Sequence, residues 1–152
     1  MDEETAGEPR AVAAENARRK AAAVPSALTL GADTLVAVDG DILGKPRDAA
    51  QAREYVARLA GRTHQVVGAI ALARDGGPPR LATAITQVHF RPATPAQLDF
   101  YVKTGEWQGR AGGYAIQGIG AILVAGIQGD YLNVVGLPLA RLLDLEPSLL
   151  PV

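Results

Sequence analysis

The sequence contains no cysteine among its 152 residues. This absence excludes disulfide bonds, thiolate nucleophiles and metal sites ligated by cysteine. Serine is also scarce: Ser26 and Ser148 are the only two, and neither lies in a G-x-S-x-G motif, which argues against a serine nucleophile. The two histidines, His64 and His89, lack the spacing of metal ligands, and we expect a chemical role for neither.

Long apolar runs and basic patches are missing as well. No apolar stretch reaches the roughly 18 residues that a membrane-spanning helix needs, and the first residues are acidic, unlike those of a secretory signal. The net charge is −1, and charges of both signs are scattered along the chain. This pattern argues against a basic face that would bind nucleic acid or a membrane surface. We expect a cytoplasmic protein that forms a single domain over residues 1–152 and binds small molecules or proteins.

The residue pattern predicts alternating helices and strands. Helices are expected at 9–23, from about 46 to 60, at 95–103 and at 138–145, and strands at 27–38, 64–74, 80–90 and 121–127. The strand at 27–38 is apolar almost throughout, which is typical of a strand covered on both faces. Asp39-Gly40 after it predicts a tight hairpin turn. The helix at 95–103 is expected to bury Leu98, Phe100, Tyr101 and Val102.

An aspartate interrupts the apolar strand at 27–38. A buried Asp33 needs a charge partner or a functional role. Only three lysines occur, against twelve arginines, and two of them, Lys20 and Lys45, lie on either side of this strand in the sequence. Lysines bind phosphate oxygens, and a carboxylate can hold a divalent cation such as magnesium or activate a water for attack on phosphorus. The aspartate and the two lysines together therefore suit a polyphosphate ligand.

Each of these residues also has a purely structural interpretation. Asp33 is equally well explained as a hydrogen-bond acceptor, and Lys45, which precedes a proline, as a solvated turn residue. Gln117 lies in the glycine-rich run at 105–120, where its amide would satisfy loop backbone groups. Residue types and spacing alone leave both interpretations open.

Six short motifs nevertheless occur in a specific order. They are Gly31-Ala32-Asp33-Thr34, Gly44-Lys45-Pro46, Leu59-Ala60-Gly61-Arg62-Thr63-His64, Ala111-Gly112-Gly113-Tyr114-Ala115-Ile116-Gln117-Gly118, Gly129-Asp130-Tyr131 and Val134-Val135-Gly136-Leu137-Pro138. In this order they closely resemble the Maf-like nucleoside triphosphate pyrophosphatases, over residues 2 to about 143.

The resemblance implies an α/β fold with a long twisted mixed β-sheet flanked by helices, as in the inosine-triphosphate pyrophosphatases, and usually a homodimer. It implies hydrolysis of a nucleoside triphosphate to the monophosphate and pyrophosphate with a divalent cation, Mg²⁺ or Mn²⁺. Asp33 would accept a proton from the attacking water, and Asp33 and Glu3 would hold the metal. The matching substrate-binding positions are Glu3, Lys20, Thr34, Lys45 and Gln117.

The glycine-rich motif carries the implied substrate preference. In the family, a Tyr-x-Ile-Gln-Gly version goes with dTTP and UTP, and a Ser-Phe-x-x-Glu-Gly version goes with 7-methyl-GTP. This sequence has Tyr114-Ala115-Ile116-Gln117-Gly118, so the resemblance favours pyrimidine triphosphates, standard or modified, as in a house-cleaning hydrolase. A glutamine amide can both donate to and accept from a pyrimidine edge. Thr34 matches a second position associated with base selection.

The chain departs from this resemblance at its start. Family members begin with a strand and an S-x-x-R-R phosphate loop, and neither occurs here. Either the start codon was assigned too late, or the chain is naturally truncated with an opened cleft and an unpaired sheet edge. As written, the chain is expected to have weak or no pyrophosphatase activity. The alternatives are a nucleotide-binding or regulatory protein linked to cell-division control and a non-functional fragment.

Overall fold

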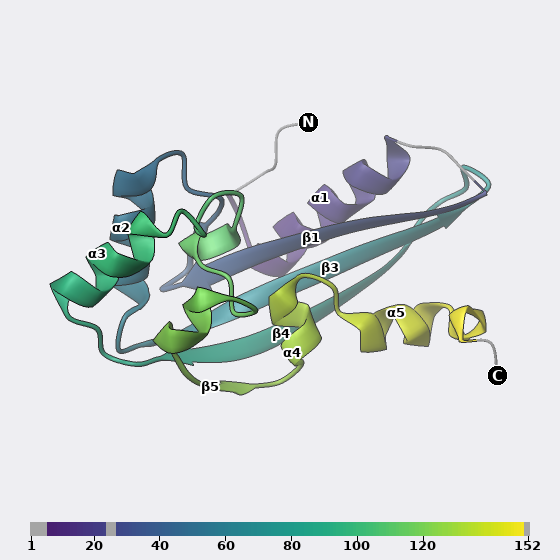
Figure 1. Cartoon of the computed structure of the whole chain (residues 1–152). Helices are drawn as coiled ribbons and strands as arrows, with labels where there is room; N and C mark the ends of the chain where they lie inside the picture. Colours follow the sequence, from purple (N-terminus) through teal and green to yellow (C-terminus); the bar gives the residue numbers. More distant parts are fainter. Residues whose placement is uncertain (1–5, 24–26, 151–152) are drawn as a thin grey trace.

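A computed structural model describes residues 6–23 and 27–150 and shows a long, twisted β-sheet with helices against its faces (Figure 1). The strands, in the spatial order β2-β1-β3-β4-β5, are β1 (Leu28–Val38), β2 (Asp41–Leu43), β3 (Thr63–Arg74), β4 (Arg80–Phe90) and β5 (Val124–Gln128). The helices are α1 (Pro9–Ala22), α2 (Ala49–Leu59), α3 (Pro95–Lys103), α4 (Tyr131–Val135) and α5 (Leu139–Leu145), with short 3-10 helices η1 (Ala111–Gly113), η2 (Ile119–Leu123) and η3 (Pro147–Leu149). No helix within these described ranges has the length and apolar character of a membrane span.

The connections between strands explain the sheet topology. Asp39 and Gly40 form the predicted tight turn between β1 and β2, with φ angles of 52° and 79°, and the short loop 75–79 joins β3 to β4. Strands joined so closely can pair only antiparallel. The expected α/β fold with a long sheet flanked by helices is confirmed. The expected mixture of strand directions needs correction, because all the pairs formed by the described residues are antiparallel.

Helices pack on both faces of the sheet, as the alternation of side chains along its strands requires. On one face α1 contributes a buried cluster with β1 and β3, made of Val12, Ala13, Ala17, Ala21, Leu35, Val67, Ala69 and Ala71. On the other face Leu142 of α5 clusters with Ile70 and Leu72 of β3. The main core lies at the end of the sheet near α2 and α3 (Figure 1).

The start of β1 is less covered than its apolar sequence suggests. Leu28 and Leu30 are exposed, whereas Leu35 and the residues that follow it in β1 are buried. The two leucines lie on the face where α5 packs, and α5 contacts mainly β4 rather than β1. The expected burial of this strand on both faces therefore holds only for its second half.

The structure differs from the sequence-based expectation at two further places. Phe100 was expected in the core, but its side chain is 58% exposed, because it lies on the opposite side of α3 from the buried Leu98 and Tyr101. The strand expected at 121–127 begins three residues later, after η2. Helix α4 was not predicted; the Asp130 side chain starts it by accepting a hydrogen bond from the Leu132 N–H at 2.9 Å.

An ionisable ring lies inside the main core. His64 is 2% exposed and packs edge-on against the rings of Phe90 and Tyr114, with centroids 4.9 and 5.4 Å away. Its Nε2 and the Tyr114 hydroxyl share a hydrogen bond of 2.6 Å. Burial lowers the pKa of His64 to about 4, and the nearby His89 adds a smaller lowering.

The free energy of unfolding is expected to fall as the pH drops from about 6.5 to about 4. The unfolded chain binds a proton on His64 near the ordinary pKa of 6.5, whereas the folded chain does so only near pH 4. Between these values the unfolded state holds more protons, so lowering the pH favours it. The full contribution, about 3 kcal/mol, is present above pH 6.5. Urea unfolding at about pH 7 and about pH 5 should show about 2 kcal/mol of this loss.

A His64→Gln variant is the control for this titration, since its amide can still bond the Tyr114 hydroxyl but does not titrate. Its free energy of unfolding should depend less on pH than that of the parent chain over this interval. Equal pH dependence in the two proteins would contradict the assignment to His64.

Candidate functional site

A cavity of about 280 Å³ lies at the edge of β1. Strand β2 pairs with β1 only at Val36–Val38, so within the described residues no strand covers the earlier part of β1 on that side. Asp33 and Thr34 are consecutive, and their side chains point to opposite faces of the sheet, yet both line the cavity. The cavity therefore wraps around the exposed strand edge.

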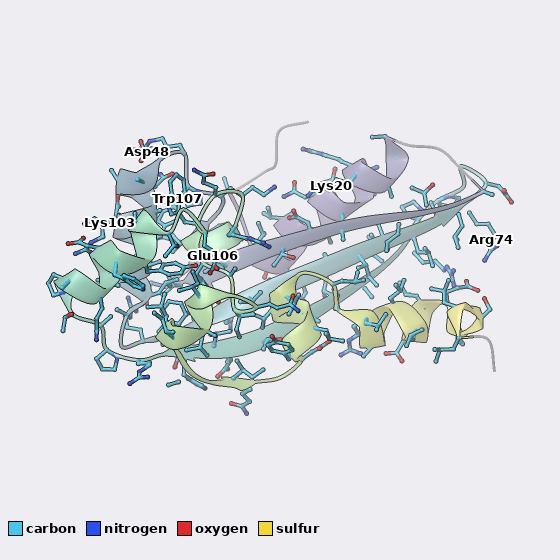
Figure 2. All side chains as sticks on the ribbon, viewed as in Figure 1. Lys20, Asp48, Arg74, Lys103, Glu106 and Trp107 are labelled. Carbon is cyan, nitrogen blue, oxygen red and sulfur yellow. The ribbon has the colours of Figure 1, made fainter. Side chains whose placement is uncertain are left out.

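Helix α1 holds the buried carboxylate of Asp33, which is 5% exposed. The Lys20 ammonium donates to Oδ1 at 2.8 Å, and the Asn16 amide donates to Oδ2 at 3.1 Å. Asn16 and Lys20 are four residues apart and so share one side of the helix. Figure 2 shows Lys20 on α1, the helix that runs alongside β1. Both carboxylate oxygens are thus paired, which makes the burial of this charge tolerable.

Gly31 allows α1 to approach the strand this closely. A Cβ atom at this position would lie 2.1 Å from the Ala17 carbonyl oxygen and 2.6 Å from the Ala21 nitrogen, both in the backbone of α1. Any larger residue would push the helix away from β1. The glycine two residues before Asp33 is therefore required to bring Asn16 and Lys20 to the carboxylate.

Three cationic side chains line the cavity with this single carboxylate. Lys20 comes from α1, Lys45 from the loop after β2, and Arg110 from the glycine-rich run. The Gly112 N–H donates to the Gly44 carbonyl at 3.1 Å, which ties the glycine-rich run to the loop that carries Lys45. An excess of positive charge in one hollow favours a polyanionic ligand such as a chain of phosphates.

Other residues that line the cavity carry groups suited to a nucleobase. Gln117 is exposed and lines the cavity, as does Thr34, whose hydroxyl donates to the Gly136 carbonyl at 3.4 Å. The backbone before Gln117 follows a path that glycine permits: Gly112 has a φ of 70°, and a Cβ there would lie 2.7 Å from a Val36 methyl group. Amide and hydroxyl groups beside an apolar wall can bind a flat polar ring.

The structure brings together five of the six residues expected at the site. These are Lys20, Asp33, Thr34, Lys45 and Gln117, all of which line the one cavity. Glu3 lies outside the described residues. The sequence pattern did not predict two further residues of the site. They are Arg110, which lies in the glycine-rich run, and Asn16. The signal for Asn16 was available, since it lies four residues before Lys20 in an otherwise alanine-rich helix.

A metal site made entirely of protein ligands is absent from the described residues, which contain no group of three or more histidine, cysteine or acidic side chains. Magnesium needs less, because it is usually bound by one or two carboxylates together with substrate phosphates and water. Asp33 fits this requirement: it is a hard oxygen ligand at the cavity wall, and each of its oxygens can accept more than one contact.

Comparison with known proteins places this geometry in context. The sequence profile of the family described as Maf-like protein matches residues 1–146. A dTTP/UTP pyrophosphatase of Moorella thermoacetica is 51% identical over 136 residues, which are 89% of this chain and 70% of the relative. Proteins of the same name from Symbiobacterium thermophilum and Pyrococcus furiosus are 52% and 44% identical, over 82% and 80% of this chain. The chain spans about two thirds of the length of these relatives.

A Gly31→Ala substitution tests the close approach of α1. The added methyl group must displace helix backbone, so the free energy of unfolding should fall by about 3 kcal/mol. The matched control is Gly126→Ala in β5, where a Cβ would meet no atom within 4 Å and the loss should stay under about 1 kcal/mol. Urea unfolding compares the two variants, and equal losses would contradict the role assigned to Gly31.

Proposed function

This chain belongs to the Maf-like protein family, and on that premise we propose that it hydrolyses dTTP and UTP to the nucleoside monophosphate and pyrophosphate. The observation that supports it best is the convergence, in one cavity, of the buried Asp33 carboxylate, three cationic side chains and Gln117. The relatives named dTTP/UTP pyrophosphatase support the choice of substrate. The proposal includes a single domain over residues 1–152, a cytoplasmic location and a homodimer.

In this proposal the triphosphate lies against the cationic part of the cavity. Lys20, Lys45 and Arg110 come from three separate segments, so together they can contact several phosphate groups at once. Charge compensation of this kind stabilises the transition state of phosphoryl transfer more than any covalent chemistry from the protein. Of the expected binding residues, Glu3 lies outside the described residues, and its role rests on the family resemblance alone.

Asp33 is the proposed proton acceptor. A water molecule attacks the α-phosphorus in line, its oxygen bonds to phosphorus, and its proton passes to the Asp33 carboxylate. The bond between the α-phosphorus and the bridging oxygen breaks, and pyrophosphate leaves. Hydrogen bonds from Lys20 and Asn16 hold the carboxylate in place. A bound Mg²⁺ or Mn²⁺, held by Asp33 and the phosphates, would neutralise phosphate charge.

Gln117 and Thr34 are the proposed contacts to the base. The amide of Gln117 offers a donor and an acceptor, and the Watson–Crick edge of uracil or thymine carries both complementary groups. Thr34 of β1 lines the same cavity, and its hydroxyl can also contact a ring. This arrangement favours pyrimidines that present a ring N–H between two carbonyl groups.

An Asp33→Asn variant tests the catalytic assignment. Removing the proton acceptor should abolish the pyrophosphate release from UTP with Mg²⁺ that the parent chain shows, however weak that release is. Binding of UTP, measured by titration calorimetry, should persist because the cationic side chains remain. The control is Asp75→Asn in the exposed β3–β4 turn, which should keep full activity. Unchanged release by Asp33→Asn would rule out the assigned role, and binding without turnover in the parent chain would favour a nucleotide-binding protein.

A Gln117→Glu variant tests base selection. A carboxylate cannot donate to a uracil carbonyl but accepts well from the amino group of cytosine, so the preference for UTP over CTP should fall by about tenfold or more. Affinities for the two nucleotides, which share sugar, phosphates and ring size, measure this ratio. Gln128→Glu, an exposed change in β5, serves as the control and should leave the ratio unaltered. An unaltered ratio in Gln117→Glu would remove this residue from base recognition.

A further inference from the structure

A carboxylate outside the cavity holds the segment that carries Gln117. Glu106 follows α3 in the chain, and Figure 2 places it among the loops beside that helix. Its Oε1 accepts a hydrogen bond from the Gly120 N–H at 2.8 Å, and its Oε2 accepts one from the Ile119 N–H at 2.9 Å. One side chain thereby fixes two consecutive backbone groups just after Gln117.

A buried tyrosine fixes the same segment on its other side. Tyr101 is fully buried in α3, and its hydroxyl donates to Oε1 of Glu106 at 2.8 Å. The same hydroxyl oxygen accepts a hydrogen bond from the Ala115 N–H at 3.1 Å, two residues before Gln117. We call Tyr101 and Glu106 the loop clamp. It holds the backbone on both sides of the glutamine.

Two glycines make room for the loop clamp. A Cβ on Gly118 would lie 2.4 Å from Oε2 of Glu106, and a Cβ on Gly120 would lie 2.3 Å from the Ala115 carbonyl oxygen. Gly118 therefore leaves room for the Glu106 carboxylate, and Gly120 leaves room for the Ala115 backbone that binds Tyr101. Their conformational freedom is restrained by the same contacts.

The charge state of Glu106 suits this role. Burial raises the pKa of its carboxyl group, but the hydrogen bonds from the Gly120 and Ile119 N–H groups and the Tyr101 hydroxyl outweigh burial and lower it overall. An ionised carboxylate accepts all three bonds at once, and charge-assisted bonds are the stronger kind.

The amide of Gln117, in contrast, has no hydrogen bond to any other described residue, so its position depends on the backbone that carries it. Neither member of the loop clamp lines the cavity. We propose that Glu106, acting with Tyr101, is a positioning residue for base selection: it sets the direction of the Gln117 amide without touching the nucleotide. The inference rests on the proposed function, since it presumes that Gln117 reads the base.

The test compares binding of UTP, CTP and inorganic tripolyphosphate to the 152-residue chain by titration calorimetry. A Glu106→Gln variant has one acceptor oxygen where two are needed, so the loop should shift and the preference for UTP over CTP should fall about tenfold. Tripolyphosphate has no base, so its affinity should stay within about twofold of the parent value. Glu54→Gln, an exposed change on α2, is the matched control.

A Tyr101→Phe variant removes the shared hydroxyl, keeps the buried ring and should lower the UTP preference in the same direction. Unchanged UTP preference in both variants would overturn the inference. Equal weakening of tripolyphosphate and UTP would also overturn it, because it would indicate a general loss of structure. A parent chain that binds tripolyphosphate but shows no preference for UTP would instead refute the proposed base recognition, and that outcome is visible before any variant is made.

Discussion

The pairing of a buried carboxylate with one helix is the interaction on which the rest of this site depends. Asp33 lies within a strand that also supplies core residues, so its charge is tolerable only while Lys20 and Asn16 reach it. They reach it because Gly31 lets α1 lie directly on β1. The same contact closes one face of the sheet, which couples the geometry of the site to the stability of the core.

The position of the cavity follows from the short β2 strand. Because β2 pairs with only the end of β1, neighbouring side chains from both faces of the sheet meet at its edge within the described residues. Asp33 and Thr34 are consecutive and point to opposite faces of the sheet, yet both line this one cavity. The carboxylate and the cationic side chains therefore share the cavity with groups that suit a base. The glycine-rich run completes the wall, and the loop clamp offsets the conformational entropy that its glycines would otherwise cost.

Local signals in the sequence predicted most of the fold. The Asp39-Gly40 turn forms as predicted. Helices α1 and α3 begin at the expected residues, where a proline and the capping box of Thr94 and Gln97, respectively, fix the first turn. The errors fall where local signals are weak: η2 and α4 are too short to show a helical period, and Phe100 is apolar but faces away from the core.

The sequence by itself determined which chemical groups are present and which of them share a helix face or a turn. The helical period, for example, aligns Asn16 with Lys20 whatever the helix packs against. Only the tertiary structure decided that this pair meets Asp33, that Arg110 joins Lys45 at the cavity, and that Glu106 binds the backbone after Gln117. Those contacts join residues distant in the chain, and their distances depend on how layers pack, which no short-range pattern encodes.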